Sequence, residues 1–167
     1  PISYEGGYTM KKIFKALFML SAFSLLCFAQ AKQTTITKDI VELNENGAGK
    51  KVGTVTVTET ANGTSISVLA TGLKVDAIQV ELHLYGKNSP KPTKDKSGNL
   101  VIGGGLGEDM ENLGYLMIDA DESVNQTIEC GLKHSDLKGK SLVITEDVSG
   151  YTDNTQTKKE PLYVAIF

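Results

Sequence analysis

The chain is 167 residues long, carries a formal net charge of −3 and has 17 basic residues, all of them lysine. From residue 32 onward it has 14 lysines and 19 acidic residues, a net charge of −5, which disfavours nucleic acids and anionic membranes as partners. The 136 residues of this part suit one domain with a sizeable core.

Residues 10–31 carry the three parts of a secretory signal peptide: a basic start, an apolar run at 16–28 and a small-x-small cleavage pattern that ends at Ala31. The apolar run is shorter than the roughly 20 residues that cross a bilayer. We therefore expect an exported chain with no membrane attachment after cleavage. Residues 1–9 precede the first methionine and are interpreted as translated upstream sequence, which leaves 32–167 as the folded domain.

Hydrophobic side chains then recur with a period of two. Valine and threonine alternate over residues 51–58, which predicts a strand with one buried face. Asn62-Gly63 is a strong two-residue hairpin signal, and the alternation resumes at residues 66–70.

The next predicted strand, at residues 77–85, has an apolar face and a polar face. The apolar face is expected to point to the core, and the other face carries Gln79, Glu81, His83 and Tyr85. Further strands are expected at residues 39–44, 99–102, 115–119, 125–129, 141–146 and 161–167. About eight strands without a convincing amphipathic helix predict an all-β fold, an eight-stranded Greek-key sandwich or barrel.

Four other features of the sequence predict loops, a turn and the role of a cysteine. Residues 87–97 and 149–159 are polar and predict long loops. The glycine-rich stretch at residues 103–107 is not followed by Gly-Lys-Ser/Thr, so we expect a flexible turn and not a phosphate-binding loop. Cys130 is the one cysteine after residue 31, and it is either a buried apolar residue or the link of a disulfide-bonded homodimer.

Segments spread along the domain resemble the copper/zinc superoxide dismutases of the bacterial periplasm. Residues 52–60 are similar to an early hairpin strand of that family, and residues 72–73 match its Gly-Leu turn. Residues 132–140 match the segment before the last metal-ligand strand, and residues 151–153 resemble a motif of its electrostatic loop. The resemblance covers nearly all of residues 32–167, and it implies the same fold and a periplasmic or secreted bacterial protein.

The resemblance also implies that most of the family's metal ligands have been lost. The His-x-His pair of the family falls on Glu81 and His83, so only the second imidazole remains. The final zinc His and Asp fall on Asp109 and Asn112, and the last copper His falls on Thr145. These five residues are vestigial positions of a metal site that the chain is expected not to form.

Other parts of the family pattern are missing as well. The long loop that holds the bridging His and two zinc His is reduced to about residues 103–111. The disulfide cysteines fall near Asn88 and Val164, and the Arg that attracts the substrate anion falls near Pro161. The chain has two histidines, and His134 belongs to a distant segment.

These losses favour a non-catalytic superoxide-dismutase-like domain, without a cofactor, that acts as a binding or structural module for an unidentified protein partner. A redox copper needs several imidazoles, and a structural zinc usually needs four N, S or O ligands. Two alternatives remain: Glu81 and His83 hold a metal ion weakly in a metal-binding or delivery protein, or the chain is a residual superoxide dismutase. At Glu81 and His83 the simpler interpretation is an exposed polar strand face.

Overall fold

The computed structural model describes residues 33–147 and 159–167, so the predictions for residues 1–31 and for nearly all of the loop at 149–159 lie outside the described part. The described residues form the strands β1 (Thr34–Asn44), β2 (Gly47–Thr60), β3 (Gly63–Ala70), β4 (Gln79–Tyr85), β5 (Thr93–Lys94), β6 (Leu100–Val101), β7 (Asp109–Met117), β8 (Val124–Cys130), β9 (Ser141–Asp147) and β10 (Lys159–Ile166). A 3-10 turn, η1 (Gly104–Leu106), and a one-turn helix, α2 (His134–Leu137), complete this part. None of its helices is long and apolar enough to cross a membrane.

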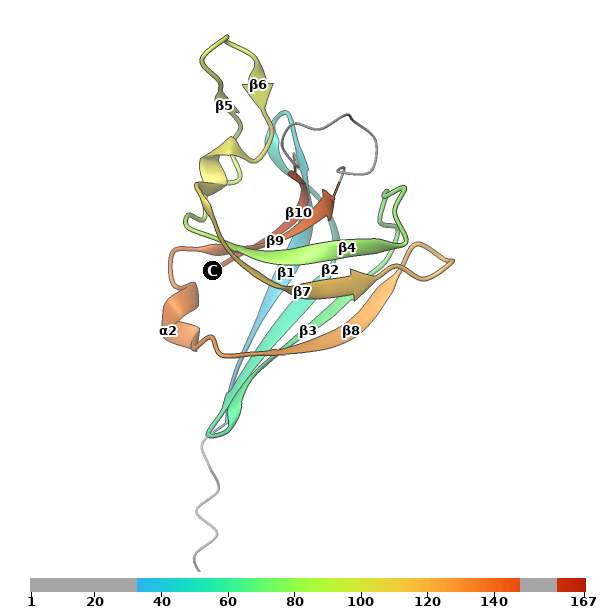
Figure 1. Cartoon of the computed structure of the whole chain (residues 1–167), viewed down its shortest axis with the longest axis vertical. Coiled ribbons are helices and arrows are strands. Elements are labelled where there is room, and N and C mark those ends of the chain that lie inside the picture. The colour runs from blue at the N-terminus through green and yellow to red at the C-terminus, as the bar shows by residue number, and fades with distance from the viewer. Residues whose placement is uncertain (1–32, 148–158) are drawn as a thin grey trace, which may run out of the picture. The chain divides into compact units, whose positions relative to one another are not determined.

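Eight strands form one antiparallel sheet in the order β7-β4-β9-β10-β1-β2-β3-β8. The sheet curls until its edge strands, β7 and β8, face one another, so that it nearly closes into a barrel (Figure 1). Although β4 follows β3 in the chain, it lies at the other end of the sheet, and β8 returns to pair with β3. This crossover is a Greek-key connection, and the predicted all-β Greek-key fold is confirmed.

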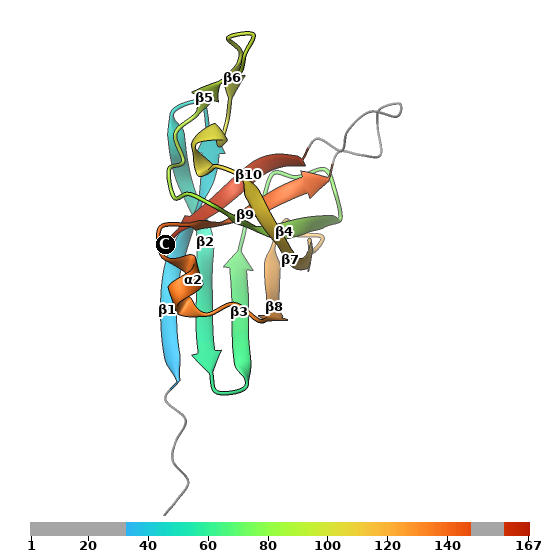
Figure 2. The same ribbon diagram turned by 60° about the vertical axis from the view of Figure 1, so that its left-hand side comes forward.

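Two of the predicted segments differ in detail from the structure. Within the expected loop at residues 87–97, β5 pairs with β6 in a short hairpin that projects from one end of the barrel (Figure 2). β7 begins at Asp109, whereas the sequence predicted a strand from Tyr115. Its first half pairs with β4 through two register shifts, and these bulges interrupt the alternation by which a strand is recognised in sequence.

The glycine-rich stretch at residues 103–107 is a turn, as expected, and the structure shows that it is closely packed. Leu106 within it is fully buried, and its carbonyl accepts a hydrogen bond from the Lys87 backbone N–H at 2.7 Å. The Gly105 N–H donates to the Lys91 carbonyl at 2.9 Å. A Cβ on Gly105 would lie 2.6 Å from that carbonyl oxygen, so only glycine fits at this place.

Apolar clusters lie on both sides of the sheet. The barrel interior is packed with alternate residues of the strands, among them Val55, Val57, Ile66, Val68, Val80, Leu82, Leu84, Leu116, Leu142 and Ile144. A second cluster covers the outer face and consists of Leu43, Tyr85, Leu106, Val143 and Val164. η1 contributes Leu106 to this second cluster, so the turn covers the outer face of the sheet beside β4. Each fully buried apolar side chain stabilises the folded state by about 1.5–3 kcal/mol.

The open seam of the barrel, between β7 and β8, is bridged by one side chain. The Gln126 amide on β8 accepts a hydrogen bond from the Met117 backbone N–H at 3.0 Å and donates one to the Tyr115 carbonyl at 2.7 Å. A side chain thus takes the place of ladder hydrogen bonds, and it satisfies backbone groups of an edge strand that would otherwise face solvent.

We expect Gln126→Ala to lower the free energy of unfolding by about 1–2 kcal/mol, because two hydrogen bonds across the seam are lost. Urea denaturation measures the change. Asn125→Ala is the matched control, because Asn125 is exposed beside it on β8 and a surface change of this kind costs within about 0.5 kcal/mol. Equal stabilities of the two variants would show that the Gln126 bridge does not hold the seam.

Candidate functional site

Glu81 and His83 point away from the barrel interior, as predicted, but the prediction of an exposed polar face was wrong. The exposed fraction is 6% for Glu81 and 1% for His83. A period-two pattern indicates the side of the sheet to which a residue points and does not indicate what covers that side. Here β7, the neighbour of β4 in the sheet, contributes the side chains of Asp109 and Asn112, which hydrogen-bond to His83 and Glu81.

The His83 imidazole lies between two carboxylates. Its Nε2 is 2.9 Å from Oε2 of Glu81, and its Nδ1 is 2.8 Å from Oδ1 of Asp109. Each contact needs one proton between nitrogen and oxygen, so three groups share two protons: either an imidazolium faces two carboxylates, or a neutral imidazole faces one carboxylate and one carboxylic acid. In both arrangements neither ring nitrogen keeps a lone pair that is free for a metal.

Asn112 extends this cluster to the backbone of β7. Its side-chain N–H donates to Oε1 of Glu81 at 3.1 Å, and its side-chain oxygen accepts a hydrogen bond from the Gly114 N–H at 2.9 Å. Gly114 has a φ of +144°, a conformation that other residues rarely adopt. Both carboxylate oxygens of Glu81 are therefore engaged, and β4 and β7 are cross-linked by side chains as well as by their ladder.

Thr145 on β9 pairs directly with Glu81 and is fully buried. Its hydroxyl has no hydrogen-bond partner among the described residues, which costs about 1–3 kcal/mol. The structure thus brings together the five positions that the resemblance assigns to metal ligands, Glu81, His83, Asp109, Asn112 and Thr145, where β4 lies between β7 and β9. The sequence does not indicate that the Gly114 N–H holds the Asn112 side chain, because this contact depends on the positive φ of Gly114.

This donor set does not fit a copper or zinc ion. The two carboxylates contact opposite nitrogens of the ring, so the three groups do not converge on one point. Among residues 33–147 and 159–167, no three His, Cys, Asp or Glu side chains form a group that could hold a metal ion. Thr145 offers a neutral hydroxyl, which is a poor ligand, and copper that changes oxidation state needs several imidazoles.

The other histidine belongs to a different part of the fold. The ring Nε2 of His134, in α2, lies 3.1 Å from the Val57 carbonyl, and the His134 backbone N–H donates to Oε2 of Glu59 at 2.7 Å. These contacts anchor α2 on β2. Near one of the aligned cysteine positions, the Asn88 side chain donates to the Phe167 carbonyl at 3.1 Å, so a hydrogen bond ties this loop to the end of β10.

Burial changes the acid–base behaviour of two further groups. Burial, and then the charge of Asp109, raise the pKa of Tyr85 from 10.0 to about 12, so this hydroxyl stays neutral at physiological pH. Burial also raises the pKa of the half-buried Cys130 thiol, which packs against the barrel core. A raised pKa lowers the thiolate fraction that disulfide exchange requires, and a dimer linked through Cys130 stays a prediction.

We expect His83→Leu to lower the free energy of unfolding by about 3–5 kcal/mol, because it removes the imidazole that contacts Oε2 of the buried Glu81 carboxylate. The double variant His83→Leu/Glu81→Leu should recover part of this loss, since both charged groups are then gone. Chemical denaturation measures both variants.

Thr145→Val is the matched control in the same place. It removes a hydroxyl that has no partner, so it should be neutral or stabilising. If His83→Leu and Thr145→Val proved equally mild, the cluster would contribute nothing to stability and the account of it would be wrong.

Comparison with solved structures identifies the fold. No family model and no curated protein matches the chain. The copper/zinc superoxide dismutase from Brucella abortus is similar with a TM-score of 0.65 and 22% identity, over 80% of this chain and 99% of that one. The monomeric copper, zinc superoxide dismutase from Salmonella enterica gives a TM-score of 0.61 and 18% identity over 80% and 99% of the two chains.

A mutant of a superoxide-dismutase-like protein from Bacillus subtilis is also similar, with a TM-score of 0.51 and 20% identity over 78% of this chain and 95% of that one. These identities are low, while the neighbours are covered almost completely. The chain therefore has the Greek-key barrel fold of the bacterial copper/zinc superoxide dismutases and superoxide-dismutase-like proteins.

Proposed function

We propose that this chain is a divergent, non-catalytic superoxide-dismutase-like domain that is exported and acts as a binding or structural module. The observation that carries the proposal is the hydrogen-bonded cluster of Glu81, His83 and Asp109. It occupies the positions that the resemblance assigns to metal ligands, and each of its donors already has a partner. Two shared protons take the place of a metal ion in neutralising the carboxylates.

Other features support the proposal that this chain does not catalyse superoxide dismutation. Superoxide is an anion, and the family attracts it with an Arg that falls near Pro161 here. The chain contains no arginine, and residues 32–167 carry a net charge of −5, which repels anions at long range. The segment that would link two metals is shortened to η1 and the start of β7, and it packs against β4 instead.

The surface of β7 supports a binding role. Met110, Tyr115 and Met117 on this strand are each about half exposed, and Ile78, just before the neighbouring β4, is 77% exposed. Exposed apolar side chains that gather on one strand are typical of surfaces that contact a partner. The predicted signal peptide at residues 10–31 places that partner in the periplasm or outside the cell in this proposal.

The alternative, weak metal binding through Glu81 and His83, requires both groups to give up existing hydrogen bonds. The Glu81 carboxylate would have to leave Asn112 or His83, and the imidazole would have to lose a proton-sharing contact. Since a buried carboxylate without a partner is costly, metal affinity through this pair should be low.

We expect the purified protein, after incubation with copper and zinc and removal of unbound metal, to keep well below one metal ion per chain. Its dismutase activity should not exceed that of the same amount of free copper. Elemental analysis and a superoxide assay measure the two quantities.

His83→Gln and His134→Gln are the variants that locate any activity. Activity well above that of free copper, lost in His83→Gln and kept in His134→Gln, would overturn the proposal and support a residual dismutase. Stoichiometric metal without activity, lost in the same variant, would support the metal-binding alternative.

A further inference from the structure

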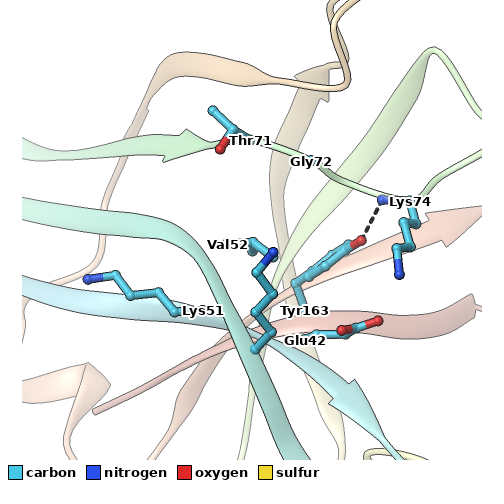
Figure 3. Close-up of a pocket in the computed structure, with 8 residues that line it drawn as sticks. Glu42, Lys51, Val52, Thr71, Gly72, Lys74 and Tyr163 are labelled. Carbon is cyan, nitrogen blue, oxygen red and sulfur yellow. Dashed lines mark hydrogen bonds between the residues drawn. The ribbon is translucent and has the colours of Figure 1, made fainter.

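A pocket of about 170 Å³ lies between β1, β2, β10 and the loop that joins β3 to β4 (Figure 3). At about 30 Å³ for each water molecule in the liquid, it has room for about five waters, and so for a ligand of a few non-hydrogen atoms. Its lining residues are Glu42, Lys50, Lys51, Val52, Thr71, Gly72, Lys74 and Tyr163. These residues belong to neither the Glu81–His83–Asp109 cluster nor the family's metal positions.

Three lysines line this small pocket in a domain that is acidic overall. Lys51 forms an ion pair with Asp39 at 2.7 Å, but both side chains are more than half exposed, and such pairs contribute little. In the part of the chain that the structure describes, neither Lys50 nor Lys74 has a carboxylate within ion-pair distance. Two lysines that form no ion pair among the described residues thus line the same pocket, together with the Glu42 carboxylate.

A buried hydroxyl supplies a hydrogen-bond donor beside these charges. Tyr163 is 2% exposed, and its hydroxyl oxygen accepts a hydrogen bond from the Lys74 backbone N–H at 2.6 Å (Figure 3). Burial raises the pKa of Tyr163, so its proton is retained. No described residue accepts that proton, which leaves one donor at the pocket wall.

Register shifts in two strand pairings lie beside the pocket. The β1–β2 pairing shifts register between Ile40 and Val41 and again before Leu43, and the β9–β10 pairing shifts between Pro161 and Tyr163. Bulges re-aim side chains and are frequent beside functional sites. Here they lie next to the lining residues of β1 and β10, Glu42 and Tyr163, which face one another in register.

We propose that this pocket binds a small oxyanion, a carboxylate or phosphate group, held by Lys50 and Lys74 and by a hydrogen bond from Tyr163. Lysine ammonium groups bind such oxygens as point charges, and a hydrogen bond to a charged acceptor is stronger than a neutral one. Glu42 opposes the anion because its carboxylate lines the same pocket. The inference does not depend on whether the domain has lost a metal site.

Titration of the ¹⁵N-labelled protein with inorganic phosphate, and separately with acetate, at low ionic strength tests the proposal. Saturable NMR shifts should appear at Gly72, Lys74 and Tyr163 with at least one of the two anions, and which anion binds identifies the ligand class. Sodium chloride at equal ionic strength should not reproduce the shifts.

Four variants make the test specific to this pocket. Lys50→Gln/Lys74→Gln should weaken binding by about tenfold or more, and Tyr163→Phe by about three- to tenfold. Glu42→Gln should tighten it. Lys91→Gln/Lys96→Gln removes the same charge from two exposed lysines outside the pocket and should leave affinity within about twofold, because distant exposed charges are screened.

Shifts that do not saturate with either anion, or that chloride reproduces, would overturn the proposal. Equal weakening of anion binding in the two double-lysine variants would also overturn the proposal, because the loss of affinity would then come from the change in overall charge. Both double variants change exposed side chains, so neither result is obscured by a failure to fold.

Discussion

A buried imidazole between two carboxylates has to share two protons with them, and this constraint organises the outer face of the barrel. Glu81 and His83 come from β4, and Asp109 comes from β7, so the shared protons link two strands. Asn112 continues the link to the backbone at Gly114. The net charge of such a cluster stays small without a metal ion, which is what allows it to remain buried.

An apolar cluster covers the same outer face beside the polar one. Leu106 in η1 packs with Tyr85 and Val143 on the same outer face, so β4 and β9 are covered on both sides. The segment from Gly103 to Glu108 is pinned to the end of β4 by backbone hydrogen bonds. A buried polar cluster of this kind need not be more stable than an apolar one, but removal of one member is costly. The cluster therefore fixes the pairing of β4 with β7 more than it raises overall stability.

The sequence predicted the strands whose side chains alternate. It did not predict features that depend on contacts between strands, such as the start of β7 and the burial of His83. Residues 51–58 and 66–70 lie within β2 and β3, and the two strands pair without a register shift from Gly53 to Thr60, so the period of two is kept there. The start of β7 was missed because bulges break that period. The burial of His83 was missed because its polar partner Asp109 comes from another strand, β7.

At the candidate sites, too, the sequence did not reveal how residues from different strands contact one another. Alignment to a family placed Glu81, Asp109 and Thr145 near one another, but it did not reveal that the carboxylates take opposite sides of one ring. The pocket at Lys74 and Tyr163 left no sequence signal, because its residues are up to 121 positions apart and come together through the pairing of β1 with β2 and with β10.

The central claim, that shared protons occupy the place of a metal, is tested most directly by ¹⁵N NMR of the His83 ring. The account predicts that the Nδ1 and Nε2 signals of His83 do not change when one equivalent of zinc or a chelator is added to the purified protein. A large shift or loss of the Nε2 signal with one equivalent of zinc, reversed by chelator, would contradict it and would restore a metal to this site.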